Sequence, residues 1–73
     1  MVFRELAAEE REALTLFANG RTTEEIAAAL GVSKSLALHY LRVASRKLGA
    51  RNRVNAVAIA IERGLITVAR RDV

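Results

Sequence analysis

Six basic side chains lie within residues 34–53, and no acidic side chain lies among them. These six are Lys34, Arg42, Arg46, Lys47, Arg51 and Arg53. Residues 1–33, by contrast, contain three arginines and six glutamates. A segment in which every charge is positive is suited to binding phosphate groups, as in nucleic acids. A solvated basic helix surface is the alternative explanation.

The periodicity of this segment predicts a helix over Lys34–Leu48, capped at its start by Ser33. At about 100° per residue, one side carries polar residues and a single leucine: Ser35, Leu38, His39, Arg42, Ser45 and Arg46. The opposite side is expected to face the core, and its apolar residues are Leu36, Ala37, Tyr40, Leu41, Val43, Ala44 and Leu48. Lys47 interrupts this apolar side, and we expect its stem to lie along the surface with the ammonium group outside.

Three side chains on the polar side are predicted to contact DNA bases. Arg42, in the middle of the helix, can donate two hydrogen bonds to O6 and N7 of a guanine. Leu38 can contact the methyl group of a thymine, and His39 can contact a base or a phosphate. Each residue also has a simpler explanation. Arg42 could contact a phosphate or form a surface ion pair, Leu38 could be an ordinary surface leucine, and His39 could be a solvated imidazole.

A second group of residues is predicted to contact DNA phosphates. Helix starts present backbone N–H groups that favour anions, and basic side chains add positive charge. The group comprises Thr22, Thr23, Lys34, Ser35, Arg46, Lys47 and Arg51. Thr22 and Ser33 are also expected to cap their helices. Arg51 and Arg53 can bind phosphate, or instead the carbonyl groups that end the preceding helix.

The chain as a whole predicts an all-α fold of four helices. Their expected ranges are Ala8–Asn19, Thr23–Leu30, Lys34–Leu48 and Arg53–Arg63. Each is followed by a glycine suited to the left-handed conformation that ends helices: Gly20, Gly31, Gly49 and Gly64. Thr22 and Glu25 form a capping box, and Asn52 is the expected cap of the last helix. We expect one domain over residues 1–66 and a loosely held tail over 67–73.

The second and third helices are joined by the short turn Gly31-Val32-Ser33. Two helices joined by a turn of three or four residues that contains glycine form the helix-turn-helix pattern. In that pattern the second helix, here Lys34–Leu48, enters the major groove of DNA.

The last helix, Arg53–Arg63, is apolar on nearly all sides, with Asn55 as the one polar residue between Val54 and Ile61. A helix that is apolar all round is covered all round, and the other three helices can cover one face only. The remaining face is predicted to form a two-fold dimer interface through Val54, Val57, Ala58 and Ile61. The alternative is complete burial within one copy of the chain, or slight exposure of its alanines.

Composition argues against several other classes of protein. With no cysteine and one histidine, the chain is not expected to hold zinc or any cofactor. No nucleophile–base pair or carboxylate dyad stands in a predictable pocket, so we do not expect an enzyme. Two phenylalanines and one tyrosine are the only aromatic residues, so the core must be aliphatic. The chain lacks a long apolar run and a signal-peptide pattern, which predicts a cytoplasmic protein without membrane contact.

Several motifs resemble those of the LuxR-type DNA-binding domain over about residues 6–66. They are Leu6…Glu10-x-Glu12-x-Leu14, Ala18-x-Gly20-x-Thr22-x-x-Glu25-Ile26-Ala27-x-x-Leu30-Gly31-Val32-Ser33, Arg46-Lys47-Leu48-Gly49 and Arg53-x-x-Ala56-Val57…Gly64-Leu65-Ile66. The resemblance implies a four-helix module that binds double-stranded promoter DNA as a homodimer and regulates transcription. The resemblance is also compatible with RNA polymerase as a further partner.

The loop Arg51-Asn52-Arg53 and the start of the second helix look most like the quorum-sensing branch of this family. In that branch a separate sensor domain binds an acyl-homoserine lactone. A small-molecule ligand is therefore expected only if such a sensor domain exists.

The chain departs from the family pattern in its recognition helix. Where the family commonly has Thr-Val-Lys-x-His, the chain reads Leu36-Ala37-Leu38-His39-Tyr40. Leu38 thus stands at the basic base-contacting position and Tyr40 at the histidine position, whereas Arg42 is retained at the next contact position. In the first helix, Ala7 and Glu9 replace a threonine and an arginine of the family. Because Leu38 is neutral, we expect fewer ionic contacts with DNA and a weaker salt dependence than is usual.

Two other functions compete with that of a sequence-specific transcriptional regulator. The first is a protein-interaction module that pairs through the last helix with a related regulator and antagonises it, which the altered recognition helix favours. The second is a promoter-recognising segment of a sigma factor, which shares the pattern of residues 20–33. The last helix and Arg46-Lys47-Leu48-Gly49 argue against the sigma-factor segment.

Overall fold

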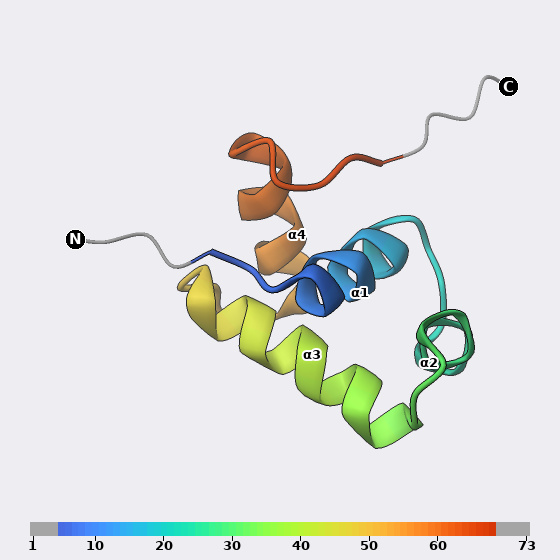
Figure 1. Cartoon of the computed structure of the whole chain (residues 1–73). Coiled ribbons are helices and arrows are strands. Elements are labelled where there is room, and N and C mark those ends of the chain that lie inside the picture. Colours follow the sequence, from blue (N-terminus) through green and yellow to red (C-terminus); the bar gives the residue numbers. More distant parts are fainter. Residues whose placement is uncertain (1–4, 69–73) are drawn as a thin grey trace, which may run out of the picture.

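The computed structural model describes residues 5–68, which form four α-helices. They are α1 (Ala8–Ala18), α2 (Thr23–Leu30), α3 (Lys34–Lys47) and α4 (Arg53–Glu62) (Figure 1). The all-α prediction is confirmed. Helix α2 has the predicted bounds, and the other three helices end one residue earlier than predicted. Of the predicted tail, only the exposed Thr67 and Val68 lie within the described residues.

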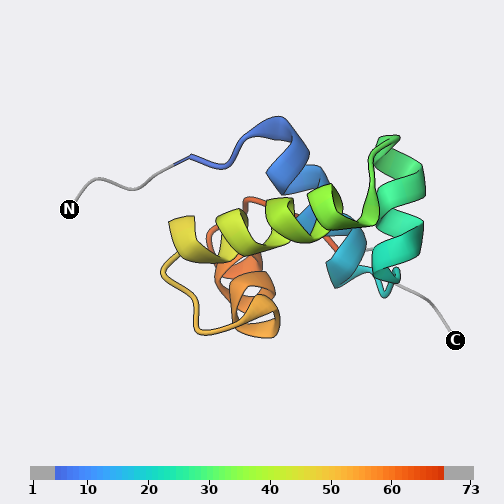
Figure 2. The ribbon, with the colours of Figure 1, turned by 90° about the horizontal axis from the view of Figure 1, so that it is seen from below.

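Helix α3 lies along one outer side of the molecule and contacts each of the other three helices. Helix α2 precedes it and α4 follows it, and these two helices lie toward opposite ends of α3 (Figure 1). Seen from below, α3 lies in front of α1, and no other helix covers its outer side (Figure 2). The helix predicted to bind DNA therefore packs against the other three helices on its inner side and is exposed to solvent on its outer side.

Side chains cap the starts of α2, α3 and α4 as predicted. The Thr22 hydroxyl accepts a hydrogen bond from the Glu25 N–H at 3.1 Å, and the Glu25 carboxylate accepts one from the Thr22 N–H at 2.8 Å. The Ser33 hydroxyl accepts one from the Leu36 N–H at 3.1 Å. Each such cap is worth about 1 kcal/mol of helix stability.

Glycine sets the direction of the chain on both sides of α3. Gly31 ends α2 with φ of +69°, and the following Val32 N–H donates to the Ala27 carbonyl at 3.0 Å. Gly49 has the same φ after α3, and the Ala50 N–H donates to the Ser45 carbonyl at 2.9 Å. Residues with a Cβ adopt this conformation at a cost, so glycine makes these tight reversals favourable.

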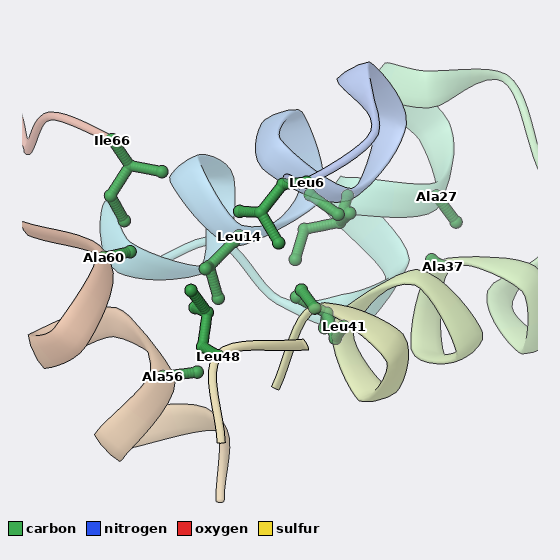
Figure 3. Packing of buried hydrophobic residues seen from close by; sticks show 12 residues of the cluster. Leu6, Leu14, Ala27, Ala37, Leu41, Leu48, Ala56, Ala60 and Ile66 are labelled. Atoms are coloured by element: carbon green, nitrogen blue, oxygen red, sulfur yellow. The ribbon is translucent and has the colours of Figure 1, made fainter. Parts of the chain in front are cut away.

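The core is aliphatic, as the composition predicts (Figure 3). Its largest fully buried side chains are Leu14 from α1, Ile26 from α2 and Leu41 from α3. Half of the twelve buried core residues are alanines, which lets helix backbones approach closely: Ala13, Ala27, Ala37, Ala44, Ala56 and Ala60. After α4 the chain folds back, because the Leu65 N–H donates to the Ala60 carbonyl at 2.8 Å and Ile66 is buried.

Two residues predicted on the buried side of α3 do not lie in the core. Leu36 is 37% exposed, and Val43 is half-buried outside the core cluster. The buried stripe is centred on Ala37, Leu41 and Ala44. Leu36 and Val43 lie more than about 100° from its centre around the helix, so the prediction made the apolar side too wide.

Candidate nucleic-acid interface

The outer side of α3 and the connection between α3 and α4 line an open groove of about 610 Å³, which we call the arginine groove. Its lining residues are Leu38, Arg42, Ser45, Arg46, Ala50, Arg51, Asn52 and Arg53. Four guanidinium groups contribute to this surface and no carboxylate does. Such a groove attracts polyanions, because nothing within its lining offsets the positive charge.

The polar side of α3 faces outward, as predicted. Ser35, His39, Arg42 and Arg46 are exposed. Leu38 is half-buried at the edge of the arginine groove. The Ser45 hydroxyl donates to the Leu41 carbonyl at 2.9 Å, so this serine is occupied within its own helix.

The connection after α3 is held by two asparagines. The Asn52 side chain accepts a hydrogen bond from the Asn55 N–H at 2.8 Å, and the Asn55 side chain accepts one from the Arg51 N–H at 3.1 Å. Asn52 was predicted as the cap, but the role of Asn55 was missed. Asn55 stands three residues after the cap, the position from which a capping-box side chain reaches back, but it is not a glutamate or glutamine and it accepts from Arg51, the residue before the cap.

Arg53 has a protein contact of its own. Its guanidinium lies 5.8 Å from the centre of the Phe17 ring, which is close enough for a cation–π interaction. Phe17 belongs to α1, so this contact ties the start of α4 to α1 and fixes one wall of the arginine groove. The ring contact is a role that the sequence did not predict.

The starts of α2 and α3 present the other predicted phosphate contacts. Thr22 and Ser35 are exposed and Thr23 is half-buried. Lys34 Nζ lies 2.9 Å from Glu24 Oε2, and both side chains remain largely exposed. The hydrogen bond from Lys34 lowers the pKa of Glu24. An ion pair in water contributes little to stability, so Lys34 can exchange this carboxylate for a phosphate.

Lys47 is placed differently from the prediction. Its ammonium is not outside but lies 2.8 Å from Glu10 Oε1 and 3.4 Å from the Glu5 carbonyl oxygen. Only 21% of the Lys47 side chain and 11% of the Glu10 side chain are exposed. The charge of Lys47 therefore serves the packing of α3 on α1, and the ammonium is not placed for the predicted phosphate contact.

Glu10 is the one buried acidic residue among residues 5–68. Burial raises the pKa of its carboxyl group, but other effects outweigh it and the net pKa is lowered. These are hydrogen bonds from the Lys47 ammonium and the Ala7 N–H, together with the positive charge of Lys47. Glu10 is therefore held ionised beside Lys47.

Helix α4 presents an apolar stripe to the solvent. Val54 is 71% exposed and Ile61 is 46% exposed, and Ala58 between them is also exposed. Their spacing places all three on one side of the helix. Val57 is half-buried against the core. Complete burial of this helix, the alternative prediction, is therefore wrong.

No helix among residues 5–68 is long and apolar enough to cross a membrane. In the same part of the chain, no three metal-binding side chains form a cluster that could hold an ion.

Residues 4–60 match the family model described as bacterial regulatory proteins of the luxR family. A similar curated protein is the response regulator RamR of Streptomyces coelicolor. It is 42% identical over 59 residues, which are 81% of this chain and 29% of RamR. The chain spans 25–30% of the length of the curated relatives that it matches.

Solved structures share the arrangement of the four helices. The transcription factor GerE is 25% identical, with a TM-score of 0.81 over 88% of this chain and 97% of GerE. VqmA of Vibrio cholerae, described as a dimer, gives a TM-score of 0.79 at 28% identity over 86% of this chain and 29% of VqmA. A Vibrio cholerae VqmA–ligand–DNA complex gives a TM-score of 0.78 at 28% identity. The match covers 89% of this chain and 28% of the VqmA chain.

Proposed function

Because the chain belongs to the LuxR family of bacterial regulatory proteins, a family of DNA-binding transcription regulators and not of enzymes, we propose that α3 binds the major groove of promoter DNA. The observation that carries this proposal is the arginine groove, whose cations lie on the outer side of α3 and on the connection to α4. A helix of this diameter fits the major groove, and its exposed side then faces the base edges.

The exposed side chains divide into two groups by reach and chemistry. Arg42 lies in the middle of the exposed side and binds a guanine, with Leu38 and His39 as its neighbours at the bases. The phosphate contacts come from Arg46 and Arg51 beside the groove and from the helix starts at Thr22, Thr23, Lys34 and Ser35. Lys34 then exchanges Glu24 for phosphate.

A homodimer through α4 completes the proposal. The exposed stripe of Val54, Ala58 and Ile61 is an apolar surface that a second copy of the chain would cover. A two-fold pair of α4 helices would present two α3 helices to successive half-sites. The description of VqmA as a dimer supports pairing of two copies, and the exposed stripe is the reason for assigning that pairing to α4.

Arg42→Ala tests the DNA contact, with Arg11→Ala as the matched control. Both variants lose one positive charge, but Arg11 lies exposed on α1, outside the arginine groove. Binding is measured by fluorescence anisotropy on duplexes selected from a random library. We expect Arg42→Ala to lose about 1–3 kcal/mol of discrimination against the wrong base, and Arg11→Ala to retain it.

Equal behaviour of the two variants would refute base reading by Arg42. If selection with the unmodified chain recovers no duplex, and the chain pairs with a related regulator through α4, it is the antagonist instead. The altered recognition helix is the feature that favours this second function.

A further inference from the structure

Leu38 is an apolar side chain set among cations. It lines the arginine groove together with Arg42, one helical turn further along α3. It is half-buried, but it belongs neither to the buried core nor to the half-buried side chains packed against that core. Part of its apolar surface is therefore left outside the core and lines the groove where DNA would bind.

An apolar side chain in this position has one favourable partner on the base edges. In the major groove, adenine, guanine and cytosine present hydrogen-bond donors and acceptors, whereas thymine adds a methyl group at C5. Leucine has no donor or acceptor. Opposite a polar edge it would displace water without replacing the lost hydrogen bonds, which is unfavourable.

We propose that Leu38 and Arg42 read two adjacent bases together: Leu38 contacts the 5-methyl group of a pyrimidine, and Arg42 binds the neighbouring guanine. This inference rests on the proposed function, since α3 must first enter the major groove. Side chains four residues apart on a helix have Cβ atoms about 5–6 Å apart. Successive bases of one strand are about 3.4 Å apart, so the long Arg42 side chain must lean toward Leu38 by part of one base step for the two to meet neighbouring bases.

The methyl group, and not the identity of the base, is the feature that Leu38 recognises. 5-Methylcytosine carries the same group at the same position as thymine. The proposal therefore extends to a cytosine beside the guanine, because methylation of that cytosine would create the contact that thymine makes. Binding of the chain to such a site would then depend on DNA methylation.

The test removes or adds this one methyl group in duplexes selected by the full 73-residue chain. In one pair of duplexes, the thymine beside the guanine is kept or replaced by uracil, which lacks only the methyl group. In a second pair, cytosine or 5-methylcytosine stands at that position. Dissociation constants are measured by fluorescence anisotropy for the unmodified chain, for Leu38→Ala and for Leu36→Ala.

We expect the uracil duplex to bind about four-fold more weakly than the thymine duplex, the effect of one buried methyl group. The 5-methylcytosine duplex should bind tighter than the cytosine duplex by a similar factor. Leu38→Ala should bind both members of each pair equally. Leu36→Ala changes an exposed leucine of the same helix outside the arginine groove, and it should keep both preferences.

Equal binding of the thymine and uracil duplexes by the unmodified chain would overturn the inference, as would a uracil penalty that persists in Leu38→Ala. Either result leaves the proposed DNA binding intact. A chain that binds no duplex overturns the proposed function and, with it, this inference.

Discussion

The Nζ atom of Lys47 lies 2.8 Å from Oε1 of Glu10, and this contact joins the end of α3 to the start of α1. The same carboxylate oxygen accepts a hydrogen bond from the Ala7 N–H at 2.9 Å. Ala7 has no side chain that could cap α1, so Glu10 supplies half of a capping box by itself. One carboxylate therefore stabilises the first turn of α1 and holds the recognition helix against it.

Lys47→Ala is expected to destabilise the fold rather than to weaken a DNA contact. Removing the ammonium leaves a largely buried carboxylate without its counter-ion. Both groups keep some contact with water, so we expect a loss of about 1–2 kcal/mol, below the value for a fully buried pair. Urea unfolding followed by circular dichroism measures this loss.

Arg46→Ala is the neighbouring control for Lys47→Ala. Arg46 is exposed, so its loss should change stability by less than about 0.5 kcal/mol while it weakens binding to every duplex. Unchanged stability in Lys47→Ala, together with a loss of DNA affinity as large as that of Arg46→Ala, would restore the phosphate role to Lys47.

Acid is expected to weaken the fold through Glu10. The folded state lowers the pKa of this carboxyl group from its ordinary value of about 4.5, so the unfolded chain takes up the proton first. The stabilisation is therefore fully present above that value and is lost as the pH falls through the lower pKa of the folded chain. Urea midpoints measured from neutral pH to below 4.5 should show this decline.

Glu10→Gln should remove this part of the acid dependence. The unmodified chain should be more stable than Glu10→Gln at neutral pH, and the difference should shrink in acid. Glu12→Gln, a change at an exposed residue of the same helix, controls for the loss of one negative charge. A stability difference between the unmodified chain and Glu10→Gln that stays constant at every pH would contradict this role of Glu10.

The helices could be predicted from the sequence because their boundaries are encoded locally. Thr22, Ser33 and Asn52 each sit directly before a periodic apolar segment, and a glycine follows each segment within a residue or two of its end. The outward side of α3 could be predicted for a similar reason, since one helical period decides which side chains share a face.

The Glu10–Lys47 pair could not be predicted in this way. The two residues are 37 positions apart, and their contact depends on how α1 crosses α3, which no local pattern specifies. The periodicity of α3 shows which side of the helix is apolar, but it does not show how wide a stripe of that side the other helices bury. Leu36 was therefore placed in the core although it is 37% exposed.

Leu38→Lys is expected to make DNA binding more dependent on salt. A lysine here would add a cation to the arginine groove, and its flexible four-carbon stem lets the ammonium reach a phosphate beside the bases. Each phosphate contact steepens the dependence of log K on log salt concentration by about 0.9. The slope is obtained from dissociation constants at several salt concentrations. Leu36→Lys adds the same charge outside the groove and should change the slope less; equal slopes for the two variants would contradict the placement of Leu38 at the DNA.

Ile61→Asp is expected to break the proposed α4 dimer without unfolding the chain. Ile61 is 46% exposed, so a carboxylate at this position remains hydrated in a single copy of the chain. In the proposed dimer the two carboxylates would be buried together on an apolar stripe, which costs several kcal/mol. Sedimentation equilibrium should find a monomer, and cooperative binding to paired half-sites should be lost while single half-sites are still bound.

Thr67→Asp controls for the added negative charge in the dimer experiment. Thr67 is exposed, lies beyond α4 and stands beside the end of α1, where its carbonyl oxygen accepts a hydrogen bond from Asn19 at 3.4 Å, so this variant should remain a dimer. Circular dichroism establishes that both variants are folded before association is compared. If Ile61→Asp associates as strongly as the unmodified chain, a surface other than the exposed side of α4 joins the two copies, because no close-packed apolar interface accommodates two unpaired carboxylates at its centre.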